Sequence, residues 1–148
     1  MGTPTAMTTV VRDLPAPPDR VWAVLADPHS YQDWVVGARR IREADESWPS
    51  PGSMLHHELA GGIKDSTTVV DSEEGRRLVL RARARPAGIA EVVLTVEASG
   101  HGSRVQMEEK AVSGPAAVIP DLVLAPLVKA RNEKSLRRLG ELARSLKR

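Results

Sequence analysis

The last stretch of the chain, residues 121–148, constrains the fold most because its pattern predicts one long amphipathic helix. At 100° per residue, one apolar stripe about 80° wide is centred on Val128 and includes Leu124, Asn132, Ser135, Leu139, Leu142 and Leu146. The opposite side carries Lys134, Arg137, Glu141, Arg144 and Arg148. Pro126 has no backbone N–H, so it should start the regular helix or kink it.

Such a helix extends about 33 Å from Pro126 to Lys147 at 1.5 Å per residue, which spans a small domain. The rest of the chain is therefore expected to wrap around it, with the face of Val128, Ser135, Leu139 and Leu146 against the wrapping element. Asn132 and Ser135 interrupt the apolar stripe at its middle. A filled core does not need polar groups there, so they indicate a cavity.

A chain of 148 residues is long enough for one domain with a real core, and we expect a flexible tail at 1–7 followed by a single domain at 8–148. Only 3% of the residues are aromatic and none is Phe, so small aliphatic side chains must build the interior. The absence of Cys excludes a disulfide, a thiolate metal site and a Cys nucleophile. Without a signal-peptide pattern or a spanning apolar run, a cytoplasmic location is expected.

Charge is unevenly distributed, because residues 129–148 carry eight Lys or Arg against two Glu although the net charge is only +2. A basic helix can meet nucleic acid or an anionic membrane, but a solvated outer face is the simpler interpretation. No aromatic residue lies among these charges, and no nucleic-acid reading motif is present. We therefore predict no nucleic-acid partner.

The order of elements predicts an α+β fold. Thr8–Leu14 alternates like a strand, and Pro18 followed by Asp19 starts a short helix. A second short helix is expected over His29–Val36 and should stop at Gly37. A period of two then predicts an antiparallel meander of six strands with one solvated face, over Ala38–Ala44, Gly52–Leu59, Ile63–Val70, Arg76–Arg85, Ile89–Ala98 and Ser103–Val112.

Several short motifs occur in a fixed order along this chain: Pro17-Pro18-x-x-Val21-Trp22, Asp27-Pro28, Tyr31-x-x-Trp34, Asp65-x-Thr67-x-Val69, Leu78-x-Leu80, Gly102-Ser103-x-Val105 and Arg131-Asn132-x-x-x-Leu136-x-x-Leu139. In this order the chain resembles the START-like superfamily of birch-pollen-allergen-like and polyketide cyclase/dehydrase proteins (SRPBCC). The resemblance implies a helix-grip fold, in which a curved seven-stranded antiparallel sheet holds the long helix over a ligand cavity. It implies no particular function, because carriers, receptors and cyclases share this fold.

Strand parity predicts which polar side chains face that cavity. Shared parity with apolar residues of the same strand predicts a position on the buried face for Arg12, His57, Asp65, Thr67 and Glu109. Buried charges must pair or contact ligand and water. Two interpretations stay open: an internal salt-bridge network, for example Arg12 with Glu109 or Asp65, and ligand contact.

The predicted function is carriage or sensing of one small, mostly hydrophobic molecule, because ligand sites are mainly apolar with a few convergent polar groups. The predicted apolar lining is Leu80, Ala82, Leu94, Val105, Met107, Val128 and Leu139. The orienting groups are His57, Asp65, Glu109, Asn132 and Ser135, joined by Arg12, Thr67 and, at the cavity mouth, Trp34.

The rival interpretation is an enzyme resembling polyketide aromatase/cyclases, with His57, Asp65 or Glu109 moving protons; no residue is assigned as catalytic. A third is a partner-binding domain whose cavity is incidental. Adjacent strand residues such as His56 and His57 point to opposite faces, so no metal site is predicted. No cofactor is expected, and a homodimer is left open.

Overall fold

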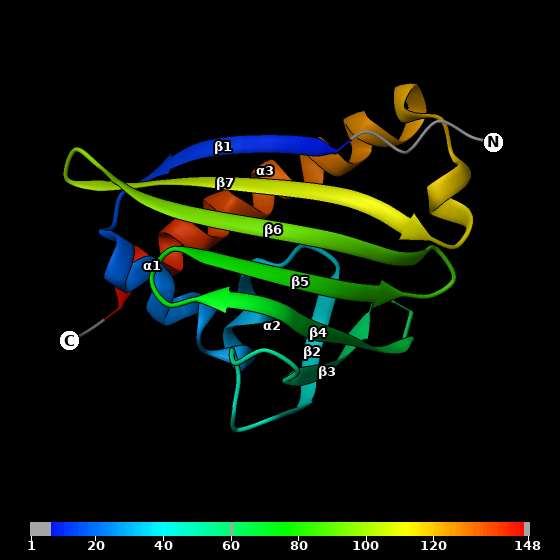
Figure 1. Cartoon of the computed structure of the whole chain (residues 1–148), viewed down its shortest axis with the longest axis horizontal. Coiled ribbons are helices and arrows are strands. Elements are labelled where there is room, and N and C mark those ends of the chain that lie inside the picture. The colour runs from blue at the N-terminus through cyan, green and yellow to red at the C-terminus, as the bar shows by residue number, and fades with distance from the viewer. Residues whose placement is uncertain (1–6, 60, 147–148) are drawn as a thin grey trace.

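The computed structural model describes residues 7–59 and 61–146, in which one sheet curves around a long helix (Figure 1). The elements in chain order are β1 (Thr8–Leu14), α1 (Pro18–Leu25), the 3-10 turn η1 (Pro28–Ser30), α2 (Tyr31–Trp34), β2 (Ala38–Ala44), β3 (Met54–Leu59), β4 (Lys64–Glu73), β5 (Arg77–Ala84), β6 (Gly88–Ser99), β7 (Gly102–Ser113), the 3-10 turn η2 (Pro115–Val118) and α3 (Asp121–Ser145). The expected tail is outside the described residues except for Met7.

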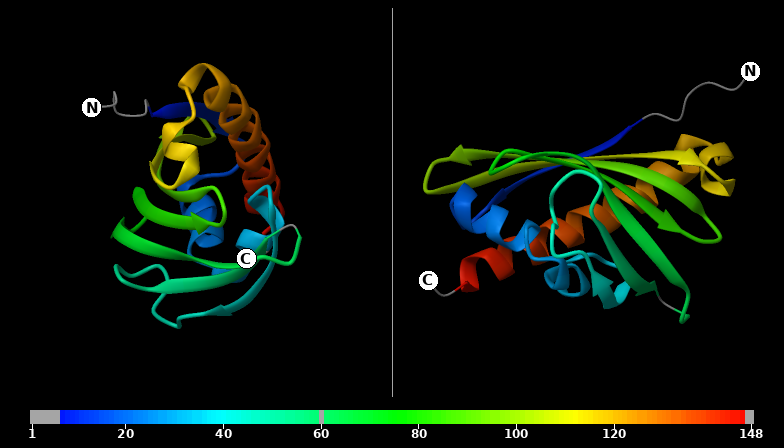
Figure 2. Two further views of the ribbon diagram at one scale, coloured as in Figure 1. Left: turned by 90° about the vertical axis from the view of Figure 1, so that its right-hand side faces the viewer. Right: turned by 60° about the horizontal axis from the view of Figure 1, so that its bottom comes forward.

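The sheet has seven strands in the order β1-β7-β6-β5-β4-β3-β2, and every neighbouring pair is antiparallel. Strands β2 to β7 form the predicted meander, whereas β1 pairs with the last strand. The segment from α1 to α2 therefore crosses from one edge of the sheet to the other. Figure 2 shows the resulting curvature, with α3 lying along the concave side. The predicted helix-grip architecture is confirmed.

Strand boundaries agree with the sequence pattern to within a few residues. The largest difference is in β4, which continues to Glu73 instead of ending at Val70. Val70 faces outward as the alternation requires, but a bulge between Val69 and Asp71 leaves Asp71 exposed as well, so the strand no longer looks amphipathic. Because parity is reset at a bulge, periodicity alone ends the strand too early.

The second short helix is shorter than predicted. Asp27 accepts a hydrogen bond from the backbone N of His29 at 3.0 Å and starts η1, which passes directly into α2. The helix ends at Trp34 because Val35 is extended, and Gly37 has a φ of 101° that favours glycine. The prediction of one helix over 29–36 is thus only partly correct.

Helix α3 begins at Asp121, so Pro126 lies inside it rather than at its start. Its buried residues all belong to the second half of the helix: Asn132, Ser135, Leu136, Leu139, Gly140 and Ala143. Arg137 and Arg144 are exposed, as predicted. Leu146 follows the end of the helix and is 38% exposed, so the prediction that it packs on the sheet is wrong.

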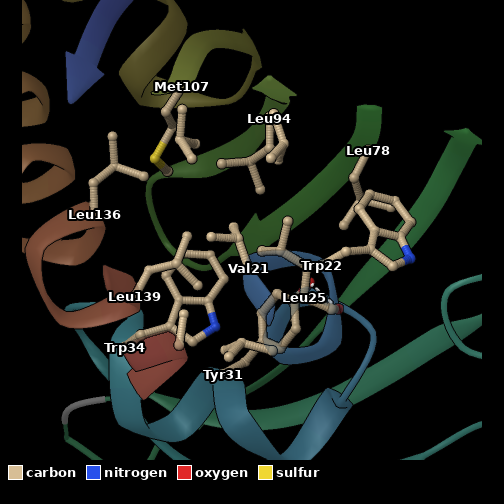
Figure 3. Close-up of a cluster of buried hydrophobic side chains, with 14 of the residues drawn as sticks. Val21, Trp22, Leu25, Tyr31, Trp34, Leu78, Leu94, Met107, Leu136 and Leu139 are labelled. Atoms are coloured by element: carbon tan, nitrogen blue, oxygen red, sulfur yellow. Dashed lines mark hydrogen bonds between the residues drawn. The ribbon is translucent and has the colours of Figure 1, made fainter. Parts of the chain in front are cut away.

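The filled part of the core lies where α1, α2 and the second half of α3 meet the sheet (Figure 3). Leu25 is central, because its carbonyl accepts hydrogen bonds from Tyr31 Oη at 2.8 Å and Trp48 Nε1 at 3.1 Å. Helix α3 approaches β1 closely at Gly140, where an added Cβ would lie 3.0 Å from Leu14 Cδ2. We call this region the closed end of the molecule.

Candidate functional site: a cavity between the sheet and helix α3

A cavity of about 500 Å³ lies between the sheet and α3, and it borders the aromatic cluster at Tyr31 and Trp34. Its walls come from α2 and the turn that follows, the inner face of β3 to β7, η2 and the first half of α3. Most of the lining is aliphatic, including Leu80, Ala82, Val92 and Leu124. The cavity arises because small side chains of the sheet, among them Ala82, Ala84, Ala90 and Ala111, face a helix segment with no fully buried residue.

Eleven of the predicted site residues line this cavity: Trp34, His57, Thr67, Leu80, Ala82, Leu94, Met107, Glu109, Val128, Asn132 and Ser135. The other four, Arg12, Asp65, Val105 and Leu139, are not among the described lining residues. Val105 and Leu139 are fully buried in the filled core instead. Parity predicts correctly that a residue lies on the inner face of the sheet. It does not predict which part of that face borders the cavity.

Arg12 is exposed, contrary to the prediction, although it shares the parity of the buried Val10 and Leu14. It lies beside Lys134 and Arg137 on the outer side of α3. The reason is that β1 is an edge strand, where the long Arg side chain can pass the helix and reach water.

Asp65 is buried in an ion-pair network rather than facing a ligand. Its carboxylate accepts hydrogen bonds from Arg83 Nε, from the Arg85 backbone N at 2.8 Å and from the Ser66 backbone N at 3.0 Å, and it pairs with Arg85 Nε at 3.4 Å. Burial alone would raise the pKa of this carboxyl, but the bonds from Arg83, Arg85 and Ser66 outweigh it and lower the pKa. The proposed pairing with Arg12 is wrong, because the strand order places β5 beside Asp65 and β1 far from it.

Glu109 also pairs, but inside the cavity. It forms an ion pair with Arg131 Nη2 and accepts a hydrogen bond from Asn132 Nδ2 at 3.2 Å. Arg131 Nε in turn donates to Asn132 Oδ1 at 3.3 Å. This triad links β7 to α3 and explains one of the two polar interruptions of the helix stripe. Asp65 and Glu109 thus both form ion pairs, with partners different from those proposed.

Ser135 explains the second interruption, because its Oγ accepts a hydrogen bond from the Val36 backbone N at 3.1 Å. The bond fastens α3 to the turn after α2, whose residues Val35 to Ala38 line the cavity. Backbone donors in such a turn have no strand partner, and a buried serine satisfies one of them.

His57 is a titratable group of the cavity wall, and it makes no ion pair within the described part of the chain. Its Nε2 lies 3.1 Å from Thr67 Oγ1, while its Nδ1 is buried without a hydrogen-bond partner among the described residues. Burial lowers the pKa of this imidazole, and the Asp65 charge and the Ser66 backbone only partly oppose that shift. The side chain is therefore a neutral imidazole at neutral pH, able to donate or accept one further hydrogen bond.

Sequence reasoning missed several lining residues. Ala90 and Val92 share the parity of Leu94 on β6, so the alternation of this strand could have predicted both as lining residues. Arg83 and Arg85 also line the cavity, although their parity predicts that they face outward. The turn after α2 and the residues of η2 could not be placed without the fold.

The described residues contain no group of three side chains arranged to hold a metal ion. Within residues 7–59 and 61–146, no helix is both long and apolar enough to cross a bilayer. The polar side chains of the cavity wall include two hydrogen-bonded pairs, His57 with Thr67 on the sheet and Glu109 with Asn132 between sheet and helix.

Fold and cavity together define a helix-grip domain of the START-like superfamily. The chain belongs to the family described as polyketide cyclase / dehydrase and lipid transport, which matches residues 5–144. No curated protein matches the chain significantly.

Solved structures with the same fold are distant in sequence. Protein MLL2253 from Mesorhizobium loti is 18% identical with a TM-score of 0.73, over 97% of this chain and 100% of that one. Ara h 8.0201 is 15% identical with a TM-score of 0.71, over 96% and 99%. DynU16, described as a putative protein in the dynemicin biosynthetic locus, is 19% identical with a TM-score of 0.71, over 96% of this chain and 48% of that one. These similarities show the shared fold.

Proposed function

We propose that this protein binds one small, mostly apolar molecule in the cavity and acts as its carrier or sensor. The observation that carries the proposal is the cavity itself: about 500 Å³ in volume, with aliphatic walls and a few polar groups. Volumes of this size, with that composition, are typical of small-molecule sites. An apolar ligand gains free energy there in proportion to the surface it removes from water.

The polar groups indicate what else the ligand carries. The free Nδ1 of His57 is buried, and a buried polar atom without a partner is costly. A hydroxyl on the ligand would satisfy Nδ1 in either tautomer of the neutral imidazole, and a carbonyl oxygen would satisfy it in the tautomer that carries its proton on Nδ1. Because Asp65 and Glu109 are already paired with arginines, a cationic ligand group has less to gain in this cavity.

A second candidate function is that of a cyclase or dehydratase, favoured by one observation. A neutral imidazole in an apolar cavity is a suitable general base, and His57 has that state. Asp65 and Glu109 are less suitable proton carriers, because each is already engaged by an arginine. Of the three residues considered from the sequence, we expect His57 to be the proton carrier in any such reaction.

Native mass spectrometry of freshly purified protein, followed by ligand extraction, tests the binding proposal. We expect a bound apolar molecule that is recovered chemically unchanged. Ala82→Leu narrows the cavity and should weaken binding, whereas Ala98→Leu makes the same change at an exposed position of β6 and should not. A cavity without affinity for apolar probes such as anilinonaphthalene sulfonate would contradict both functions. Turnover of a poly-β-ketone surrogate that His57→Ala abolishes without loss of binding would establish the enzyme instead.

A further inference from the structure

Five apolar side chains project into solvent from η2 and the first half of α3. Leu122 is 89% exposed, Val118 83% and Leu127 67%, and Val123 and Ile119 are exposed beside them. We call these five residues the apolar tip. Asp121 is the single charged residue between Gly114 and Val128, so the segment is far less polar than an ordinary protein surface.

The apolar tip is anchored to the sheet. The backbone N of Ala116 donates to the Ala87 carbonyl at 2.9 Å, and Gly88 and Gly114 approach so closely that a Cβ on Gly114 would lie 2.5 Å from Gly88 Cα. Both glycines also have positive φ. The turn between β5 and β6 thus holds η2 in place, and the apolar side chains are displayed on a fixed backbone.

The same segment forms one end of the cavity. Leu124, Ala125 and Val128 alternate with the tip residues along α3 and line the cavity from the inside. The lining residues that are themselves exposed include Arg83, Arg85, Ala87 and Arg131, which belong to the β5–β6 region and to α3. Figure 2, left, looks onto this end of the molecule, with the start of α3 and η2 above the ends of the central strands.

We propose that the apolar tip inserts into the surface of an anionic phospholipid bilayer, with the mouth of the cavity turned toward the lipid. The charges beside the tip favour this partner. Lys129 is exposed, and at the mouth Arg83 and Arg85 share the single carboxylate of Asp65, which leaves one positive charge in excess, whereas Arg131 is balanced by Glu109. Basic groups flanking an apolar, non-spanning helix are the pattern of interfacial binding to anionic lipid.

A second copy of the chain fits this surface less well. The tip projects beyond the sheet, whereas two copies would need complementary surfaces of substantial area. Two copies meeting there would also bring like charges together around the contact. An anionic lipid surface accepts a convex apolar tip and neutralises the same charges.

Because the chain contains no Cys, a single introduced thiol gives a site-specific test. Leu122→Cys, labelled with the environment-sensitive fluorophore NBD, should show blue-shifted and stronger emission on vesicles of phosphatidylcholine containing about one-third phosphatidylglycerol. The matched control is Leu146→Cys, an exposed leucine beyond the other end of α3, and its emission should not change. Equal responses at both positions would contradict insertion of the tip.

Vesicle flotation with full-length variants measures the contribution of the apolar residues. We expect Leu122→Glu combined with Leu127→Glu to weaken binding at least about tenfold, and Leu146→Glu to leave it unchanged. Absence of wild-type binding overturns the proposal, as does binding that the double variant retains, which would assign it to the basic face of α3. A concentration-dependent dimer that the double variant abolishes would establish a second copy as the partner. Probe binding without vesicles, measured on the same variants, tests the cavity separately, so failure of one proposal is distinguishable from failure of the other.

Discussion

The two halves of helix α3 have the same secondary structure but different surroundings. Between Asn132 and Ala143 the helix buries six residues, of which Asn132 and Ser135 border the cavity and the other four pack at the closed end, where Gly140 allows Leu14 to approach closely. Between Asp121 and Arg131 it buries none, because one side faces the cavity and the other faces solvent. The helix therefore combines a structural segment with a segment that forms one wall of a binding site.

Stability and ligand binding therefore depend on different segments of helix α3. Filled packing gives the second half its fixed position, and the Ser135 bond to Val36 and the Glu109 triad hold the boundary between the halves. The first half can then lack buried side chains without losing its place. Substitutions in the two halves should accordingly separate the free energy of unfolding from ligand affinity.

The largest expected contrast comes from truncating one apolar residue in each half. Leu139→Ala removes a fully buried side chain at the closed end and should lower the free energy of unfolding by about 2–5 kcal/mol. Val128→Ala removes part of the cavity wall and should lower it by less than about 1.5 kcal/mol while changing affinity for an apolar probe. Urea unfolding with two-state analysis checks both values. Equal costs would show that the two halves are packed alike.

Enlarging a side chain gives the next largest contrast. Ala143→Leu adds volume where Ala143 is fully buried in the filled core, and should cost about 1–3 kcal/mol of stability. The matched change Ala82→Leu adds the same atoms in the cavity, where they meet free space, and should cost much less. Thermal unfolding of the two variants measures this. A large loss of stability in Ala82→Leu would mean that the cavity cannot take the added volume.

A smaller effect is expected from acid titration of His57. Its folded-state pKa lies below the ordinary value of 6.5, so the unfolded chain binds the proton more readily. Stability should therefore fall as pH decreases below about 6.5, and His57→Gln should remove that part of the pH dependence. Asp65, whose folded pKa lies below 3.8, contributes stability above that value that is lost at lower pH. The two windows are separate, so a pH series of unfolding curves distinguishes them.

The smallest effect is expected at the apolar tip. Leu127→Ala removes apolar atoms that are already in water and should change the free energy of unfolding by no more than about 0.5 kcal/mol. Leu136→Ala, at a fully buried position of the same helix, provides the positive control in the same unfolding assay. A cost at Leu127 comparable to that at Leu136 would indicate that the tip is covered in solution.

The fold could be predicted almost completely from the sequence because its signals are local. Alternation in β5 and β6, turn residues between strands and the proline start of α1 each act over a few residues. The main error arose where the local signal changes, at the bulge after Val69. Pro126 was expected either to start or to kink the helix, and it lies inside it. A proline is compatible with either a start or an interior kink, and packing decides between them.

The site was less predictable, because it depends on distances between elements. Parity identified His57, Thr67 and Glu109 as inward-facing, and the cavity contains all three. It could not show that Asp65 is held by two arginines of β5, or that the edge position of β1 frees Arg12. The ion-pair partners of long charged side chains depend on how strands and helices are arranged in three dimensions. Periodicity along the sequence therefore does not predict them.

The placement of the three tryptophans has a spectroscopic consequence. Trp22 and Trp48 belong to the closed end, whereas Trp34 borders the cavity and lies 4.9 Å from Tyr31, ring centre to ring centre. Intrinsic emission therefore contains two reporters in one unlabelled molecule. Ligand entry should perturb the indole of Trp34, while global unfolding should shift the emission of all three tryptophans, so one unlabelled sample reports both titration and denaturation.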